Sequence, residues 1–392
     1  MTDREFDIVV FGATGFTGRL TAEYLAAHAP PRWAIAGRSR DKLAALGLAA
    51  PILVADALDR AACADIARRA RVVCTTVGPY TKYGSELVAA CAAAGTHYCD
   101  LTGEVSWMRA MIDAHHARAV ATGARIVHTC GFDSIPSDLG TWATQQEFAA
   151  RFGRPAATVT ALFGELSGTM SGGTAASAFV LADAMSDPAV RRILRNPHAL
   201  DPDPDAPHAR AERPSIGWER HLRMFTMPFF MADTNGPVVR RAHALAGFPW
   251  GKDFVYREIM STPGSARGLA MAVVGTGALA GLAAAMKRPR LREWLKTRAP
   301  KPGEGPSPER RARGHWTVRF VAEAGADVLV YIVSDPHGDP GYASTSKMLA
   351  ESALCLALDP LTSQGGVQTP SVAMGRHLFD RLRAAGLTFA SA

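Results

Sequence analysis

Short apolar runs alternate with segments of helical spacing along the first third of the chain. Each run is too short for a helix and ends near Gly, Asp or Thr, which is typical of a buried strand that leads into a turn. We predict six strands, over residues 7–13, 33–38, 52–56, 71–77, 96–101 and 125–131. Parallel strands joined by helices form a doubly wound sheet, with the ligand site at the carboxyl ends of the strands.

The alternation stops after Gly153, and the remainder mixes strands with helices. We predict a strand, a glycine-started helix and an exposed loop rich in Pro and Asp, over 158–168, 171–185 and 196–214. A hairpin over 317–335 is predicted to turn near Gly325, so the second sheet is antiparallel or mixed. The tail is predicted to hold two helices and a connecting loop, over 344–358, 371–385 and 365–370.

Together these elements predict an α/β protein. It has a Rossmann doubly wound parallel sheet and a second α+β domain that contains a mixed or antiparallel sheet. We expect a first domain that holds the parallel sheet and its ligand site, a substrate and homodimerisation domain, and C-terminal helices that pack back on the first domain, over residues 1–133, 134–340 and 341–392.

A glycine-rich loop follows the first predicted strand. Gly12, Gly15 and Gly18 form a GxxGxxG spacing between that strand and the first helix. Glycine at these positions lets the chain turn tightly and lets backbone amides approach a pyrophosphate at the helix N-terminus. In this strand, loop and helix setting, the spacing predicts a dinucleotide site.

The end of the second predicted strand indicates which dinucleotide is bound. An NAD enzyme usually places an acidic residue there for the ribose hydroxyls, whereas this chain has Arg38 followed by Ser39. A guanidinium binds a 2′-phosphate by charge-assisted hydrogen bonds, and a carboxylate would repel it. We therefore predict that the domain of residues 1–133 binds NADP rather than NAD. Asp56, at the end of the third strand, is placed to reach the adenine edge or to cap the next helix.

Polar residues also follow the later predicted strands. Gly78, Pro79 and Tyr80 follow the fourth strand, where the nicotinamide ribose usually lies; the proline fixes the backbone and the tyrosine offers a phenol. Segments 99–104 and 131–138 contain clustered Asp, Thr, Ser and Glu. Helix capping is the simpler role for any single one of these residues. Because they all lie at the carboxyl edge of the predicted sheet, together they are candidates for lining the site.

Residues 268–286 contain no charge and would span about 28 Å as a helix, just enough to cross a bilayer core. Seven Ala and four Gly favour a buried or interfacial helix over a spanning one. The basic loop 287–313 contains ten Lys or Arg and three Glu. Its net charge is therefore +7, which equals the formal net charge of the whole chain. We expect this loop to bind anionic lipid headgroups or an acidic carrier partner. The alternative is that 268–286 is an ordinary core helix and 287–313 an ordinary solvated loop.

Composition further limits the class of protein to which the chain can belong. With 392 residues, of which 48% are hydrophobic and 20% charged, the chain is long enough for two or three folded domains. Because the positive charge is local, we expect no nucleic-acid partner. Six cysteines without a CxxC pair indicate reduced thiols and a cytoplasmic protein, peripheral at the inner face of the plasma membrane if the basic loop binds lipid. The histidine spacing predicts no metal site.

Several segments occur in the order known from one family: GATGFTGRL, AGRS, TTVGPYTKYG, GTHYCDLTGE, RIVHTCGFDSIPSD, SGGT and GGVQTP. The chain resembles the saccharopine-dehydrogenase-like oxidoreductases, and among them the bacterial trans-acting enoyl reductases. The resemblance implies NADPH as hydride donor and reduction of a double bond in an acyl chain tethered to a polyketide synthase during complex-lipid synthesis. It assigns the dinucleotide role to Gly12, Thr14, Gly15, Phe16, Thr17, Gly18, Arg38 and Gly78.

Three functions follow from these features. The first is an NADPH-dependent enoyl reductase of an α,β-unsaturated acyl thioester, with Tyr80 as the preferred proton donor or carbonyl partner and Ser134 and Asp133 as alternatives. The second is a saccharopine-type amino-acid reductase, which the absence of Lys and Arg from 155–190 disfavours, because a dicarboxylate needs cationic partners. The third is a non-catalytic, membrane-associated NADP-binding scaffold.

Overall fold

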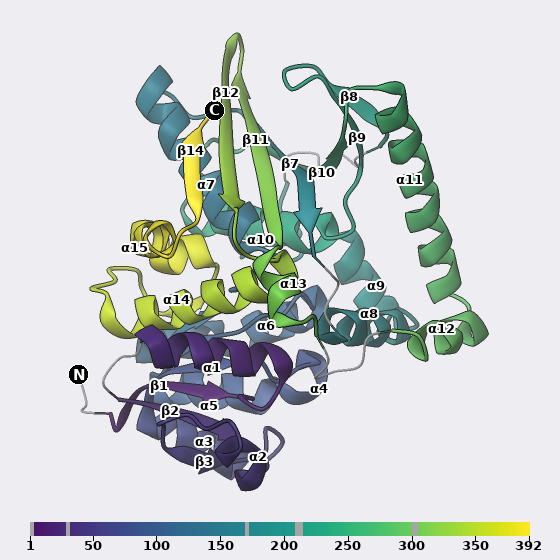
Figure 1. The fold of residues 1–392 in the computed structure, drawn as a ribbon. Helices are drawn as coiled ribbons and strands as arrows, with labels where there is room; N and C mark the ends of the chain where they lie inside the picture. Colours follow the sequence, from purple (N-terminus) through teal and green to yellow (C-terminus); the bar gives the residue numbers. More distant parts are fainter. Residues whose placement is uncertain (1–3, 29–31, 169–171, 208–214, 300–304) are drawn as a thin grey trace.

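Two sheets, one above the other in Figure 1, organise the protein. The computed structural model describes residues 4–28, 32–168, 172–207, 215–299 and 305–392. The start of the helix predicted from residue 171, the end of the loop predicted over 196–214 and part of the basic loop fall outside these residues.

The lower sheet has seven strands in the order β13-β6-β5-β4-β1-β2-β3, and every neighbouring pair is parallel. The strands are β1 (Phe6–Phe11), β2 (Trp33–Gly37), β3 (Ile52–Val54), β4 (Ala70–Thr75), β5 (His97–Cys99), β6 (Arg125–Val127) and β13 (Gly366–Gln368). The six predicted strands are confirmed. The prediction of a loop at 365–370 was wrong, because three of its residues form β13 and hydrogen-bond to β6.

Both faces of this sheet are buried, which explains its continuous apolar runs. Ile8 and Val10 share a core with α1 (Phe16–His28) and α14 (Thr345–Leu358). Val9 and Phe11 point the other way, into a core formed with three further helices. These are α3 (Arg60–Arg69), α5 (Ser85–Ala94) and α6 (Val105–Thr122), while the short helices α2 (Arg40–Ala44) and α4 (Tyr80–Tyr83) follow β2 and β4.

The upper sheet is mixed, as predicted, with the order β14-β12-β11-β7-β10-β9-β8. Only the β7–β10 pair is parallel. The strands are β7 (Thr158–Ser167), β8 (Gly217–Glu219), β9 (Met224–Pro228), β10 (Val255–Thr262), β11 (His315–Ala324), β12 (Asp327–Asp335) and β14 (Thr388–Ser391). Gly325, at φ 62°, lies in the turn of the β11–β12 hairpin, where the sequence places it. The tail contributes the edge strand β14, which the sequence analysis missed.

Three long helices connect the two sheets. They are α7 (Ile135–Phe152), α10 (Ala232–Leu245) and α15 (Pro370–Ala384). Helix α7 leaves the end of β6 and packs on β11 and β12, so one apolar core runs from the lower sheet to the upper one. Helix α14 covers the lower sheet, and α15 packs against α7 and α14. The tail thus contributes to both sheets.

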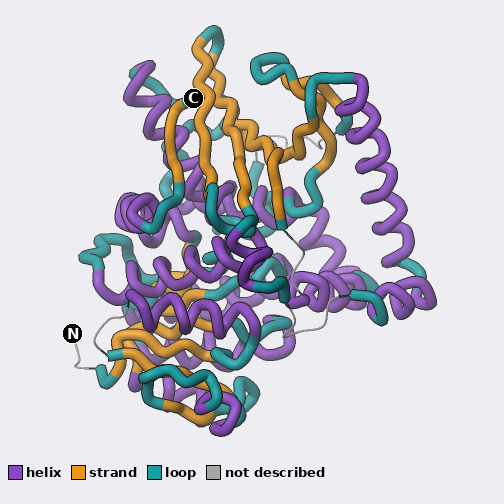
Figure 2. Tube along the Cα trace, viewed as in Figure 1, coloured by secondary structure: helices purple, strands orange, loops and turns teal. Residues whose placement is uncertain are grey.

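Four helices lie at one side of the molecule, on the right of Figure 1, and their coils are purple in Figure 2. They are α8 (Gly172–Ala184), α9 (Pro188–Arg195), α11 (Ala266–Met286) and α12 (Pro289–Lys296). Segment 268–286 is helical, but only 6% of its most apolar window is buried, so it is not a core helix. The turn η1 (Pro340–Ser344) and helix α13 (Pro308–Ala312) lie near the start of α1.

Candidate active site

The glycine-rich loop packs tightly against the end of β4. Gly12 has a φ of 94°, and a side chain there would lie 2.7 Å from Val77 Cγ2. A Cβ atom on Gly18 would collide with the carbonyl oxygen of Gly12. The N–H of Gly15 donates to that same carbonyl over 3.0 Å. The loop therefore has the close turn and the close helix packing that a dinucleotide-binding loop requires, and its residues fit the pyrophosphate of NADP.

Phe16 begins α1 and is covered by a segment that the sequence analysis did not connect to this loop. The Tyr342 ring meets it edge-on at 4.7 Å, and the Arg311 guanidinium carbon lies 5.4 Å from its ring centroid. Gly305 lies so close that a Cβ atom there would enter the Phe16 ring. Arg311 of the basic loop is thus a cation beside the predicted phosphate site. No sequence spacing indicates this contact, because the two residues come together only in the fold. Thr14 is exposed and Thr17 is partly buried beside it.

Arg38 and Ser39 follow β2 directly. Arg38 is exposed at the carboxyl edge of the sheet, where a ribose phosphate would lie. Ser39 caps α2, since its Oγ accepts from the N–H of Lys42 over 3.4 Å. Asp56 accepts from the N–H of Leu58 over 3.0 Å, and α3 is capped by Asp59. The predicted contact of Asp56 with adenine stays a prediction.

Tyr80 begins α4, directly after the loop of Gly78 and Pro79 that follows β4, and its phenol lies inside the protein. The hydroxyl donates to the carbonyl of Thr75 at 3.2 Å and accepts from the N–H of Leu101 at 3.1 Å. Burial raises the pKa of the phenol well above its ordinary value, and the nearby Asp100 carboxylate raises it further. The single proton of the hydroxyl is engaged with Thr75, which suits a role in shaping the loop of Gly78 and Pro79 better than proton donation.

Glu104 holds this loop from the other side, a role that the sequence analysis did not assign. Its carboxylate accepts from the N–H of Tyr80 at 2.9 Å and the N–H of Thr81 at 2.7 Å. It also accepts from the hydroxyls of Thr81 and Ser177, at 2.5 and 2.8 Å. Because Ser177 belongs to α8, the carboxylate ties that peripheral helix to the predicted nicotinamide side of the site.

Asp133 and Ser134 lie between the end of β6 and the start of α7. Ser134 is fully buried, and its hydroxyl donates to Oδ1 of Asn235 at 2.9 Å. Asp133 is only partly buried. Removal from water raises the pKa of its carboxyl to about 6. Of the three predicted proton donors, Asp133 therefore has the chemistry nearest to that of a general acid at neutral pH.

A buried acid of the upper sheet also supports this region. Glu258 of β10 accepts from Asn235 Nδ2 at 2.6 Å, from Tyr256 at 2.7 Å and from Ser137 at 3.0 Å. Burial raises the pKa of this carboxyl to about 7. Asn235 links Glu258 to Ser134, so a continuous chain of hydrogen bonds fixes the start of α7 beside Asp133. An isolated Glu in a strand carries no sequence signal of such a role.

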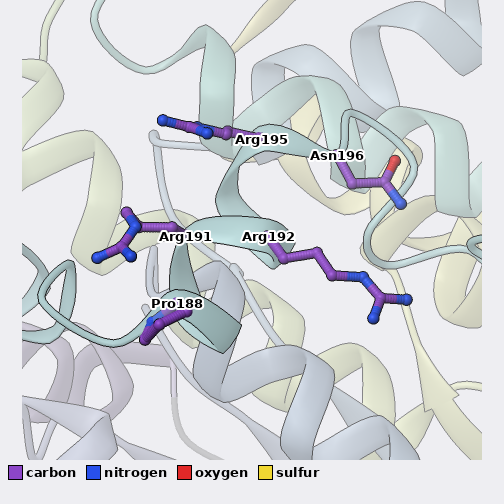
Figure 3. A pocket seen from close by; sticks show the side chains of 5 residues that line it. All are labelled: Pro188, Arg191, Arg192, Arg195 and Asn196. Atoms are coloured by element: carbon purple, nitrogen blue, oxygen red, sulfur yellow. The ribbon is translucent and has the colours of Figure 1, made fainter.

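A surface hollow lies away from these residues. Its volume is about 470 Å³, and Figure 3 shows its lining on and beside α9: Pro188, Arg191, Arg192, Arg195 and Asn196. Arg191 is held by the carbonyls of Met185 and Ser186, both at 2.8 Å. This hollow is a basic surface feature and contains none of the predicted site residues. In the part of the chain that the structure describes, no three His, Cys, Asp or Glu side chains gather closely enough to hold a metal ion.

A parallel sheet with a glycine cradle, an arginine after β2 and an acid at the carboxyl edge define a Rossmann-type NADP-dependent oxidoreductase. The comparisons agree with this class. Residues 8–127 match the saccharopine dehydrogenase NADP binding domain. Yeast saccharopine dehydrogenase (Saccharomyces cerevisiae) shares the fold, with a TM-score of 0.54 at 12% identity over 98% of this chain and 99% of that chain.

The full length of the chain also matches curated relatives. The trans-acting enoyl reductase of Mycobacterium ulcerans is 41% identical over 98% of this chain and 97% of its own length, and that of Mycobacterium leprae is 40% identical over the same shares. A Mycobacterium tuberculosis protein that is also named as a trans-acting enoyl reductase is 45% identical over 99% of this chain and 97% of that protein. The chain belongs to the trans-acting enoyl reductases, and the family that its motifs resemble is confirmed.

Proposed function

We propose that the protein reduces the double bond of an α,β-unsaturated acyl thioester with NADPH, and that the acyl chain is tethered to the carrier protein of a polyketide synthase. When bound, NADPH supplies the hydride, which adds to the β-carbon of the substrate. The family membership and the glycine cradle of Gly12 and Gly18 support this reaction.

The main support for the proposal is the position of Asp133 and the raised pKa of its carboxyl. Reduction of an enoyl thioester needs a proton at the α-carbon as well as a hydride at the β-carbon. The Asp133 carboxyl lies at the carboxyl edge of the parallel sheet, and its pKa of about 6 keeps part of the population protonated at neutral pH. We assign the proton donation to Asp133.

The remaining residues hold the reactants. Arg38 is assigned to the 2′-phosphate, the amides of the glycine-rich loop to the pyrophosphate, and Gly78 and Pro79 to the nicotinamide ribose. Glu104 keeps the loop of Gly78 and Pro79 in place through Tyr80 and Thr81. Ser134 fixes the position of Asp133 through its hydrogen bond to Asn235. We further propose that the enzyme acts in the cytoplasm as a homodimer.

Loss of NADPH absorbance with crotonyl and longer enoyl thioesters tests the proposal. The expected result is oxidation of NADPH with formation of the saturated thioester, which mass spectrometry identifies by the gain of two hydrogens. A scaffold would bind NADPH without turnover. A saccharopine-type reductase would oxidise NADPH only with an amine and a keto acid present. Either outcome would overturn the proposal.

A further inference from the structure

Helix α11 exposes an apolar surface in the middle of the chain. It has 21 residues with a mean hydropathy of 1.9 over its most apolar window, yet only Gly268 and Ala272 are buried. Its large side chains point into solvent: Leu269, Met271, Val273, Val274 and Leu282 are 41–71% exposed. Contiguous apolar surface of this kind marks an interaction site in a soluble protein. The helix is neither a core element nor near the N-terminus.

Helix α12 continues this surface with a different chemistry. Leu291 and Trp294 are 41% and 53% exposed and lie on the same helix face. The guanidinium carbon of Arg298 lies 3.9 Å from the Trp294 ring centroid, and Lys287 is exposed between α11 and α12. Residues 287–298 contain six Lys or Arg and one Glu. An exposed Trp between cations at the end of an apolar helix is typical of the boundary between lipid tails and headgroups.

Both ends of α11 are held to the rest of the protein. At its start, the hydroxyl of Thr262 donates to the carbonyl of Gly268 at 2.8 Å. In its middle, Gly275 lies against Met227 of β9. At its end, Arg292 of α12 donates to the carbonyl of Met286 at 3.2 Å and pairs with Asp183 of α8 at 2.8 Å. A helix held in this way can lie against a bilayer but cannot cross one without breaking these contacts.

Charge decides between a bilayer and a second copy of the chain. A two-fold contact through α11 would bring the cations of residues 287–298 close to the same cations of the partner, which is unfavourable. The arginines of α9, seen in Figure 3, add positive charge just after the end of α8, where Arg191 donates to the carbonyls of Met185 and Ser186. An anionic lipid surface satisfies both the apolar helix and the cations beside it.

We propose that α11 and α12 form a docking surface for an anionic lipid bilayer, with α11 lying in the interface and α12 at the headgroups. This inference holds whichever thioester the enzyme reduces. The surface also connects to the site. Asp183 of α8 pairs with Arg292 and Lys296, at 2.8 and 3.5 Å, and Ser177 of the same helix donates to Glu104 at the loop of Tyr80. A bilayer on α12 is thus linked to the candidate active site through a single helix, α8.

Flotation of the full chain with phosphatidylcholine vesicles, with and without phosphatidylglycerol, tests the docking surface. We expect binding to the anionic vesicles that weakens as salt rises. The double variant Val274→Asp/Leu282→Asp should lose it, whereas the matched pair Val120→Asp/Leu358→Asp, also exposed but on other helices, should keep it. Replacing Arg288, Arg290 and Arg298 by Gln should weaken binding on the order of 100-fold, about a factor of five per cation. Equal binding by both Asp pairs, or no binding by the native chain, overturns the proposal.

A second measurement covers the case in which the Asp pair unfolds. A single cysteine at Val274 can be labelled with an environment-sensitive dye, because all six native cysteines are buried. We expect a blue shift of its emission on anionic vesicles and no shift for the same dye at Val120. A blue shift without vesicles that grows with protein concentration would assign α11 to a second copy instead and refute lipid docking.

Discussion

Replacement of Asp133 by Asn separates the catalytic role of this carboxyl from its effect on stability. Burial raises its pKa from 3.8 to about 6, so the folded protein binds this proton more readily than the unfolded chain does. The difference corresponds to about 3 kcal/mol, as an upper bound for a partly exposed group. Because the pKa is raised in the folded protein, binding of this proton increases the free energy of unfolding. The increase is complete below pH ~4 and is lost as pH rises through about 6.

The neutral Asn side chain avoids the free-energy cost of burying a charged carboxylate at high pH. We therefore expect the Asp133→Asn variant to be more stable than the native protein at pH 8, by up to ~3 kcal/mol, and nearly equal to it at pH 4. Its rate of enoyl reduction should fall by about 10²–10⁴, the usual contribution of a general acid. Denaturant unfolding at both pH values and steady-state kinetics with a saturating enoyl thioester measure the two effects.

Asp138 provides the matched control. Burial also raises the pKa of its carboxyl to about 6, but that carboxyl accepts from the N–H and the hydroxyl of Ser371, at 2.7 and 2.6 Å. Asp138→Asn should change stability and leave the pH dependence of the rate in place. In the native protein, kcat/KM should fall as pH rises through about 6, and this fall should vanish in Asp133→Asn. An Asp133→Asn enzyme with the native rate and the native pH profile would refute the assignment.

Three further changes test the cofactor site. Arg38→Ala should remove most of the preference for NADPH over NADH, about 1.5–3 kcal/mol by titration of both dinucleotides; equal affinities in the native protein would already contradict the assignment. Gly18→Ala should abolish NADPH binding in calorimetry, because a Cβ atom has no room there, whereas Gly277→Ala on α11 meets open space and should bind normally. Arg311→Ala should weaken NADPH binding several-fold and reduce its salt dependence, whereas the exposed Arg310→Ala on the same helix should not; identical behaviour of the two variants would show that the contact with Phe16 does not extend to the phosphates.

The sequence predicted the parts of the fold whose signal is local. Strands buried on both faces are continuous apolar runs, and the spacing of Gly12, Gly15 and Gly18 is set by a single turn, so both could be read directly. The edge strands β13 and β14 could not be predicted, because three or four residues show no period and form strands only where an existing edge pairs with them. The exposure of α11 was equally invisible, since core helices and surface-docking helices have the same composition.

The candidate site divides in the same way. Its glycines and Arg38 follow from position along the chain. By contrast, the preference for Asp133 over Tyr80 depends on the raised pKa of the Asp133 carboxyl and on the Tyr80 hydroxyl, which is hydrogen-bonded to Thr75 and Leu101. Those partners are chosen by packing between β4, β5 and α6. Glu104 and Arg311 were missed for the same reason, because each acts on a residue brought to it by the tertiary fold.

The placement of β13 has a consequence for synthesis of the protein. Gly366 pairs with Arg125, so the nucleotide-binding sheet is completed only by residues near the end of the chain, after the whole upper sheet except β14 has been made. Helix α14, which covers one face of that sheet, arrives equally late. On the ribosome, the emerging first half therefore exposes an unpaired strand edge and an apolar face until translation is almost finished. Chains that terminate before residue 345 should aggregate or be degraded rather than accumulate as a free NADP-binding domain.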